Sequence, residues 1–126
     1  MKTRIIWAAL LSTVALAPLG CKTTIVDPVS QSRATYRMGK LTAEEPREID
    51  AVYTASEQAM SELGLKVVQR TKDALQAELV ARDAQDKKVS VKLLSITKDT
   101  TRVTIDISPV EKAQRIHSAI RDNLGL

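Results

Sequence analysis

The feature that most constrains this fold is a run of alternating apolar and polar residues between Leu65 and Ile107. Alternation at period two places one row of side chains on a buried face and the other row in solvent. Polar turns at 72–73, 83–88 and 98–99 divide the run into four segments. Turns this short join strands only when the strands run antiparallel. The run therefore predicts a four-stranded antiparallel meander with one buried face.

Two amphipathic segments flank the run and predict helices. The first follows a capping-box pattern of Thr42 and Glu45, with Pro46 suited to the first turn, and ends at Gly64. Its inward stripe consists of Ile49, Val52, Tyr53, Ser56, Met60 and Leu63. The second begins with a capping box at 108–111 and ends at Gly125. Its stripe consists of Ala113, Ile116, Ile120 and Leu124.

A short strand carrying Tyr36, Met38 and Leu41 is expected before the first helix. The predicted element order is therefore β-α-β-β-β-β-α. Because a sheet with one apolar face needs a cover, both helices are expected on that face, in a two-layer α+β sandwich. We expect residues 34–126 to form a single domain, because the chain shows no internal repeat and no second domain.

The first twenty residues have a different composition from the rest of the chain. Met1–Arg4 is basic, and Ile5–Leu19 is nearly all apolar and uncharged. This pattern is typical of a secretory signal, and the apolar run is shorter than the roughly 20 residues of a membrane span. Cleavage after Ala17 would leave Pro18 at the new terminus, where proline is poorly tolerated. The alternative is cleavage before Cys21, after Leu19-Gly20, which resembles a lipobox with Pro18 in place of its usual aliphatic residue.

Cys21 is the only cysteine of the chain, so it has no internal disulfide partner. We interpret it as the site of lipid attachment, palmitate included, which anchors a bacterial lipoprotein to a membrane. Residues 1–20 are then the signal peptide and residues 21–33 a flexible tether. In the sorting rule of such lipoproteins, an Asp directly after the lipidated cysteine retains the protein at the inner membrane. Because this chain has Lys22 at that position, the expected location is the periplasmic side of the outer membrane. The mature chain would carry 17 basic and 15 acidic residues, too weak a charge for nucleic-acid binding.

The residues of the domain resemble a family of small bacterial lipoproteins catalogued only as a domain of unknown function. The resemblance covers 34–124 and rests on the motif 36–41, on Ala51-Val52-Tyr53 leading to Gly64, on 101–105, and on Ser118 and Ile120. Members commonly have a Gly-Asp pair before the last helix, where this chain has the sequence Ser-Pro-Val-Glu, so no role of that turn is carried over. The resemblance implies no reaction, cofactor or catalytic residue.

No catalytic or metal-binding constellation is predicted. His117 is the only histidine and is interpreted as a packed or edge residue of the last helix. Zinc requires three or four ligands, which one histidine and an acylated cysteine do not supply. Glu44 and Glu45 are interpreted as helix-start residues, and Glu78 and Asp106 as partners in cross-strand ion pairs. No cofactor is expected.

The solvent-facing strand positions include a set that predicts an interaction patch. Its members are Val68, Val80, Leu94, Ile96, Lys92 and Arg102. The principal hypothesis is a non-enzymatic, lipid-anchored domain that binds or scaffolds an envelope protein through this face or an edge strand. The alternative is a small-ligand carrier or enzyme with a groove between helices and sheet, where His117, Tyr53 and Ser56 would meet. Peptidoglycan binding ranks below both, because its usual signature is missing. The sequence does not indicate an oligomeric state.

Overall fold

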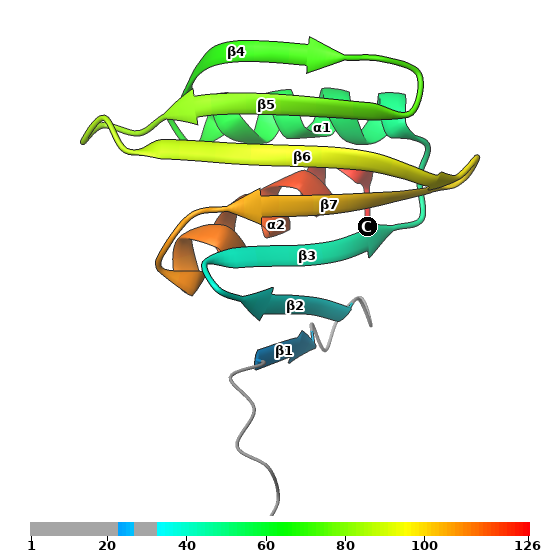
Figure 1. Ribbon diagram of the computed structural model, residues 1–126, viewed down its shortest axis with the longest axis horizontal. Coiled ribbons are helices and arrows are strands. Elements are labelled where there is room, and N and C mark those ends of the chain that lie inside the picture. The colour runs from blue at the N-terminus through cyan, green and yellow to red at the C-terminus, as the bar shows by residue number, and fades with distance from the viewer. Residues whose placement is uncertain (1–22, 27–32) are drawn as a thin grey trace, which may run out of the picture.

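A computed structural model describes residues 23–26 and 33–126 of the chain (Figure 1). The elements are β1 (Thr23–Val26), β2 (Arg33–Arg37), β3 (Lys40–Glu45), α1 (Ile49–Glu62), β4 (Lys66–Lys72), β5 (Gln76–Arg82), β6 (Lys88–Thr97), β7 (Thr100–Asp106) and α2 (Val110–Leu124). The predicted signal peptide, residues 1–20, and Cys21 lie outside the described residues.

The strands form one seven-stranded sheet in the order β1-β2-β3-β7-β6-β5-β4, and every neighbouring pair is antiparallel. The meander predicted from the alternating run is confirmed as β4 to β7. The chain leaves β3, crosses through α1 to the far edge, and returns strand by strand until β7 pairs with β3. The predicted α+β class is confirmed, with two strands more than the sequence indicated.

Both helices pack on the same face of the sheet, behind it in the view of Figure 1. α1 contacts β4, β5, β6 and β7, while α2 contacts β3, β7 and α1. The inward strand residues and the two helix stripes form one aliphatic core. Its largest fully buried members include Leu41, Met60, Leu79, Leu93, Ile105 and Ile120. In the alternating run, Leu75 is in phase with the buried Ala77 and Leu79, so the alternation places it on the inner face; it is instead 65% exposed, because it lies in the β4–β5 turn.

The first expected strand is a hairpin. β2 and β3 pair through Arg37 and Lys40, and the two residues between them, Met38 (φ 51°) and Gly39 (φ 77°), have left-handed conformations. Two-residue hairpin turns of the favoured type need positive φ at both central positions. Met38 therefore projects from the turn and is 87% exposed instead of facing the core. Methionine is an unusual residue for such a turn, which is why the sequence pattern did not reveal it.

Both predicted capping boxes are wrong, while both predicted helix ends are confirmed. Thr42 and Glu45 belong to β3, and α1 begins at Ile49 without a side-chain cap. α2 begins at Val110 after a cis Ser108–Pro109 peptide, also without a side-chain cap. At Thr42 and Glu45, the pairing of β3 with β7 takes priority over local helix initiation. Gly64 and Gly125 have the expected left-handed conformations.

Part of the predicted tether is a strand. Thr23–Val26 forms β1 and pairs with β2, from Thr23 opposite Tyr36 to Val26 opposite Arg33. The segment Thr-Thr-Ile-Val is made of β-branched residues, which favour strands when a sheet edge is available. Residues 22 and 27–32, the remainder of the predicted tether, lie outside the described residues.

Candidate functional site

The most unusual feature of the domain is a buried cluster of three ionisable side chains. Glu45 is fully buried, His117 is 7% exposed and Arg121 is 6% exposed. His117 Nε2 lies 2.5 Å from Glu45 Oε1, and Arg121 Nη1 donates to Glu45 Oε2 at 2.5 Å. Both carboxylate oxygens of Glu45 thus have a partner in the last helix, Oε1 in His117 and Oε2 in Arg121. We refer to Glu45, His117 and Arg121 as the buried cluster.

The sheet and the last helix each contribute one side of the buried cluster. Glu45 is the last residue of β3 and lies opposite Thr101 of β7. His117 and Arg121 are four residues apart in α2, which places them one turn apart on the same face. The cluster therefore joins α2 to the end of β3. Because an unpaired buried charge is costly, loss of one partner would destabilise the domain more than loss of the whole set.

The buried cluster lacks the parts of a nucleophilic site within the described residues. A nucleophile would need a hydroxyl within hydrogen-bonding reach of the histidine. The buried hydroxyl side chains of the described residues have other partners: Thr101 Oγ1 donates to the carbonyl of Arg47 at 2.9 Å, Ser56 Oγ to that of Val52 at 2.7 Å, and Ser90 Oγ to Glu78 Oε1 at 2.9 Å. The geometry therefore supports a structural ion cluster with one imidazole, one guanidinium and one carboxylate.

Sequence reasoning missed this cluster. It assigned Glu45 to a helix cap and left His117 without a partner. One local signal was available, because Arg121 lies one turn from His117 at the edge of the apolar stripe of α2. The carboxylate partner lies 72 residues earlier in the chain, so no spacing rule could have identified it.

The residues of the alternative hypothesis do not come together. Tyr53 lies beside Lys72, whose Nζ is 5.2 Å from the ring centroid. Partial burial raises the pKa of the Tyr53 hydroxyl, and the nearby Glu57 raises this pKa further. Ser56 bonds to its own helix, and His117 belongs to the buried cluster. No shared cleft of these three residues is present in the described part of the chain.

Among the described residues, no helix covers the outer face of the sheet, which carries rows of polar side chains. The strand register places Gln76, Leu94, Arg102 and Glu44 in one row, and Glu78, Lys92, Thr104 and Thr42 in the next. A groove of about 540 Å³ lies over these rows. Its lining includes Gln76, Glu78, Lys92, Leu94, Arg102 and Thr104. We refer to it as the sheet groove.

Only half of the predicted interaction patch lines the sheet groove, namely Lys92, Leu94 and Arg102. Val80 is on the same face but only 8% exposed, and it lies four positions from Gln76, the neighbour of Leu94. Four positions along a strand are about 13 Å. Val68 and Ile96 are the extra residues of two β-bulges, where the alternation of faces is interrupted. The apolar members therefore do not form the continuous patch that the alternation predicted.

The charged residues of the outer face are partly paired. Arg102 Nη2 donates to Glu44 Oε1 at 2.9 Å, and Lys40 Nζ lies 3.9 Å from Asp106 Oδ2. The cross-strand ion pair predicted for Asp106 is therefore present, with Lys40 as its partner. Glu78 instead accepts a hydrogen bond from Ser90 Oγ at 2.9 Å. Lys92, the neighbour of Glu78 in register, forms no ion pair among the described residues.

A smaller depression of about 240 Å³ lies where α1 and α2 approach the β5–β6 turn, and Asp83 contributes to its lining. Asp83 Oδ1 accepts the backbone N–H groups of Gln85 and Lys87, and the bond from Lys87 is the main reason that the pKa of Asp83 lies below its usual value. Asp83 Oδ2 lies 3.6 Å from Lys112 Nζ. The carboxylate therefore organises the turn that closes one side of the depression.

Neither a metal centre nor a membrane span is apparent in the described ranges, 23–26 and 33–126. They contain no group of three or more His, Cys, Asp and Glu side chains suited to a metal ion. They also contain no helix that is both long and apolar enough to cross a bilayer.

Comparison with known proteins identifies a family. Residues 4–123 match the family described as Protein of unknown function (DUF3568), while no curated protein matches the chain. The matched stretch covers nearly the whole sequence, from Arg4 to the last turn of α2. The chain therefore belongs to this family of unknown function.

Proposed function

We propose that this protein is a bacterial envelope lipoprotein, anchored through acylated Cys21, whose domain binds another envelope protein and catalyses no reaction. The observation that supports the anchor is the basic, apolar and small-residue pattern of the leader, which ends at the only cysteine. The family match begins at residue 4, so the apolar segment and Cys21 lie inside the matched stretch. Two or three acyl chains suffice for stable membrane attachment.

The observation that supports a binding role is the division of the sheet into two different faces. Both helices cover one face, and the other holds the sheet groove. Leu94, in this groove, is 43% exposed, and Lys92 beside it lacks an ion-pair partner among the described residues. The proposed occupant is a protein surface that places a carboxylate against Lys92 and an apolar side chain against Leu94. Such a mixture of polar and apolar contacts is typical of protein interfaces.

The position of the single histidine supports a non-catalytic role. A general base must reach the proton that it removes, directly or through one water. His117 is almost completely buried and its Nε2 is held by Glu45. The structure therefore assigns this imidazole to the contact between α2 and β3.

Metabolic labelling with an alkyne-tagged palmitate tests the anchor. The chain should incorporate the label and should have the intact mass of a diacylated or triacylated polypeptide starting at Cys21. A Cys21→Ser chain should lack the label and keep the length of the precursor. A free thiol on Cys21, or cleavage after Ala17, would overturn the proposed anchor.

Site-specific photocrosslinking in the native envelope tests the binding role. A photoreactive residue at Leu94 should give a discrete adduct with an envelope protein, while the same residue at Leu75 should not. Leu75 is a suitable control, because it is also an exposed apolar residue but lies outside the groove. The Lys92→Glu substitution should abolish the Leu94 adduct. Adducts of equal yield at both positions, or an adduct unaffected by Lys92→Glu, would refute the binding role.

A further inference from the structure

We infer that one end of the sheet faces the bilayer and binds its anionic phospholipid headgroups. This inference rests on the acylation of Cys21 proposed above. The end is defined by the first residue of β1 and by the four connections at 37–40, 62–66, 82–88 and 106–110. We refer to it as the anchor end, and to the opposite end, with the connections 45–49, 72–76 and 97–100, as the distal end.

The covalent chain brings the anchor end to the membrane surface. Thr23, the first residue of β1, is two residues after Cys21. Two residues span at most about 7 Å. Thr23 is paired with Tyr36, so the β2–β3 turn begins beside the point where the chain enters the sheet. A lipid on Cys21 therefore holds this corner of the sheet within about one headgroup layer of the bilayer.

Hydrogen bonds join the connections of the anchor end to one another. Tyr36 Oη donates to the carbonyl of Ile107 at 3.3 Å, and the Ile107 N–H donates to the carbonyl of Gly39 at 3.1 Å. Lys87 Nζ donates to the carbonyl of Ser108 at 2.7 Å, which connects the β5–β6 turn to the same region. The anchor end is therefore one continuous surface, and an orientation imposed at β1 extends to β5 and β6.

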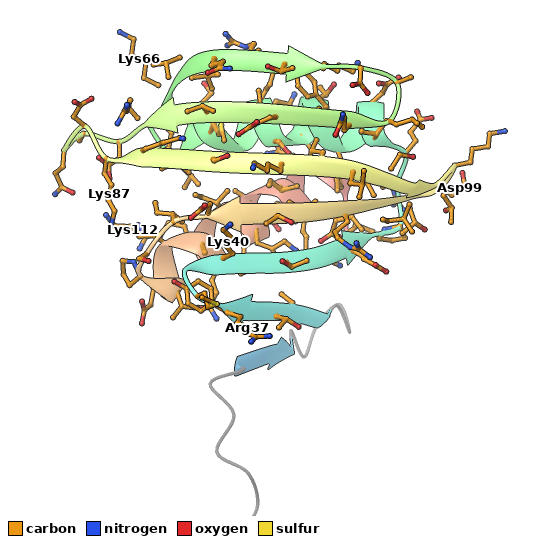
Figure 2. All side chains as sticks on the ribbon, in the orientation of Figure 1. Arg37, Lys40, Lys66, Lys87, Asp99 and Lys112 are labelled. Atoms are coloured by element: carbon orange, nitrogen blue, oxygen red, sulfur yellow. The ribbon has the colours of Figure 1, made fainter. Side chains whose placement is uncertain are left out.

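The two ends differ in charge. The connections of the anchor end carry six basic and four acidic side chains, whereas those of the distal end carry three basic and four acidic ones. Figure 2 shows Lys66, Lys87 and Lys112 at the anchor end and Asp99 at the opposite one. An anionic membrane surface attracts basic side chains and repels acidic ones. The charge distribution therefore favours the same orientation as the anchor.

The strongest evidence at this end is a row of three cations. Lys66 lies opposite Arg82, and Arg82 lies opposite Lys88, on three neighbouring strands. Directly opposed like charges destabilise a sheet, and the described residues provide none of the three with an ion pair. Neighbouring strands are about 4.8 Å apart, so the row presents three positive charges within about 10 Å. A layer of phosphate groups would compensate their repulsion.

An apolar residue extends from the same end. Met38 occupies the tip of the β2–β3 turn, beside Arg37 and Lys40, and is 87% exposed. Apolar side chains flanked by basic residues are typical of segments that enter the boundary between headgroups and acyl chains. Met38 is also close to the start of β1, because Tyr36, two residues before it, is paired with Thr23.

The orientation can be measured with reporter cysteines in the acylated protein, reconstituted in vesicles of phosphatidylcholine and phosphatidylglycerol. Gln85→Cys places a fluorophore at the anchor end, and Thr97→Cys places one at the distal end, without a change of charge. A nitroxide on the lipid headgroup should quench the first probe several times more strongly than the second. The residues between them in β6 span about 30 Å, well beyond one headgroup layer.

Removing the three cations of the row, in comparison with three other basic residues, tests whether the row causes the orientation. The triple substitution Lys66→Gln, Arg82→Gln and Lys88→Gln should bring the two quenching values close together. Each cation lost should lower the population of the membrane-facing orientation about fivefold. The matched triple Arg47→Gln, Lys72→Gln and Lys98→Gln, which changes the three basic residues of the distal connections, should leave the difference intact.

The outcomes separate this inference from the proposed anchor. The unsubstituted chain has no cysteine other than Cys21, so its labelling by the fluorophore would show a free thiol and would refute the anchor itself. If Cys21 resists labelling and the two probes are quenched equally, the anchor stands and the membrane-facing orientation is refuted. If the row substitutions leave unequal quenching unchanged, headgroup binding by the row is refuted.

Discussion

The buried cluster allows the most quantitative prediction. Substitution of Glu45 by glutamine keeps the shape of the side chain but removes its charge, and it leaves Arg121 only 6% exposed without a counter-ion. Two unit charges about 4 Å apart attract by about 4 kcal/mol at an effective dielectric constant of 20. Breaking a buried ion pair by removal of one partner costs about 3–5 kcal/mol. We therefore expect the Glu45→Gln chain to lose about 3–5 kcal/mol of unfolding free energy, a large part of the stability of a small domain.

The double variant Glu45→Gln with Arg121→Met distinguishes this explanation from a general packing effect. The double variant removes both charges of one ion pair. Its loss of unfolding free energy should therefore be clearly smaller than the sum of the losses in the two single variants. Urea denaturation of the mature chain, followed by far-ultraviolet circular dichroism, measures these values. Tryptophan fluorescence is unsuitable, because the only tryptophan is Trp7 in the leader. A loss below about 1 kcal/mol for Glu45→Gln, or additive losses in the double variant, would refute the reasoning.

Three further predictions follow from local geometry. Met38→Asn should raise the unfolding free energy in urea denaturation by about 0.5–1 kcal/mol, because Asn-Gly favours the two-residue turn. Gly39→Ala should lower the unfolding free energy, because residue 39 has a left-handed φ and an added Cβ would lie 3.2 Å from Ser108 Oγ. Val80→Lys should destabilise the domain by about 2 kcal/mol or more, and Leu94→Lys by less than about 1 kcal/mol, because the native Val80 and Leu94 side chains are 8% and 43% exposed. Equal urea midpoints of the two variants would contradict this difference in burial. The pKa of Asp83 is lowered in the folded state, so its stabilising contribution is present above the unfolded pKa of about 4 and is lost as the pH falls from there toward the folded pKa. Between pH 6 and pH 3, the Asp83→Ala chain should therefore lose less unfolding free energy than the unaltered chain. Parallel curves of unfolding free energy against pH would refute this prediction.

The local elements were accessible from the sequence because their signals are periodic. The alternation from Leu65 to Ile107 reflects a sheet with one buried face, and apolar residues of this run such as Leu79, Val91 and Ile105 are buried. Gly64 and Gly125 marked the helix ends correctly, because left-handed residues that follow helices are usually glycine. Each of these signals depends on residues close together in the sequence, so it does not depend on contacts with distant parts of the chain.

The local signals failed where pairing between distant segments decided the conformation. Thr42 and Glu45 have capping-box spacing, yet they lie opposite Thr104 and Thr101 of β7, about sixty residues later in the chain. The alternation also predicted Val68 and Ile96 as regular outward positions, whereas β-bulges interrupt the register at both. A bulge depends on how two strands fit, so the periodicity of one strand does not reveal it.

Patterns in the sequence were enough to predict the class of the fold, and residues 1–21 contain the apolar run and the single cysteine that the proposed anchor requires. Only the tertiary structure brought Glu45 to His117 and Arg121, and only the strand register aligned Lys66, Arg82 and Lys88 in one row. The physical reason is the range of the interactions. Burial and backbone conformation leave a trace in neighbouring residues, whereas charge pairing across a sheet depends on which strands become neighbours, and that depends on the whole chain.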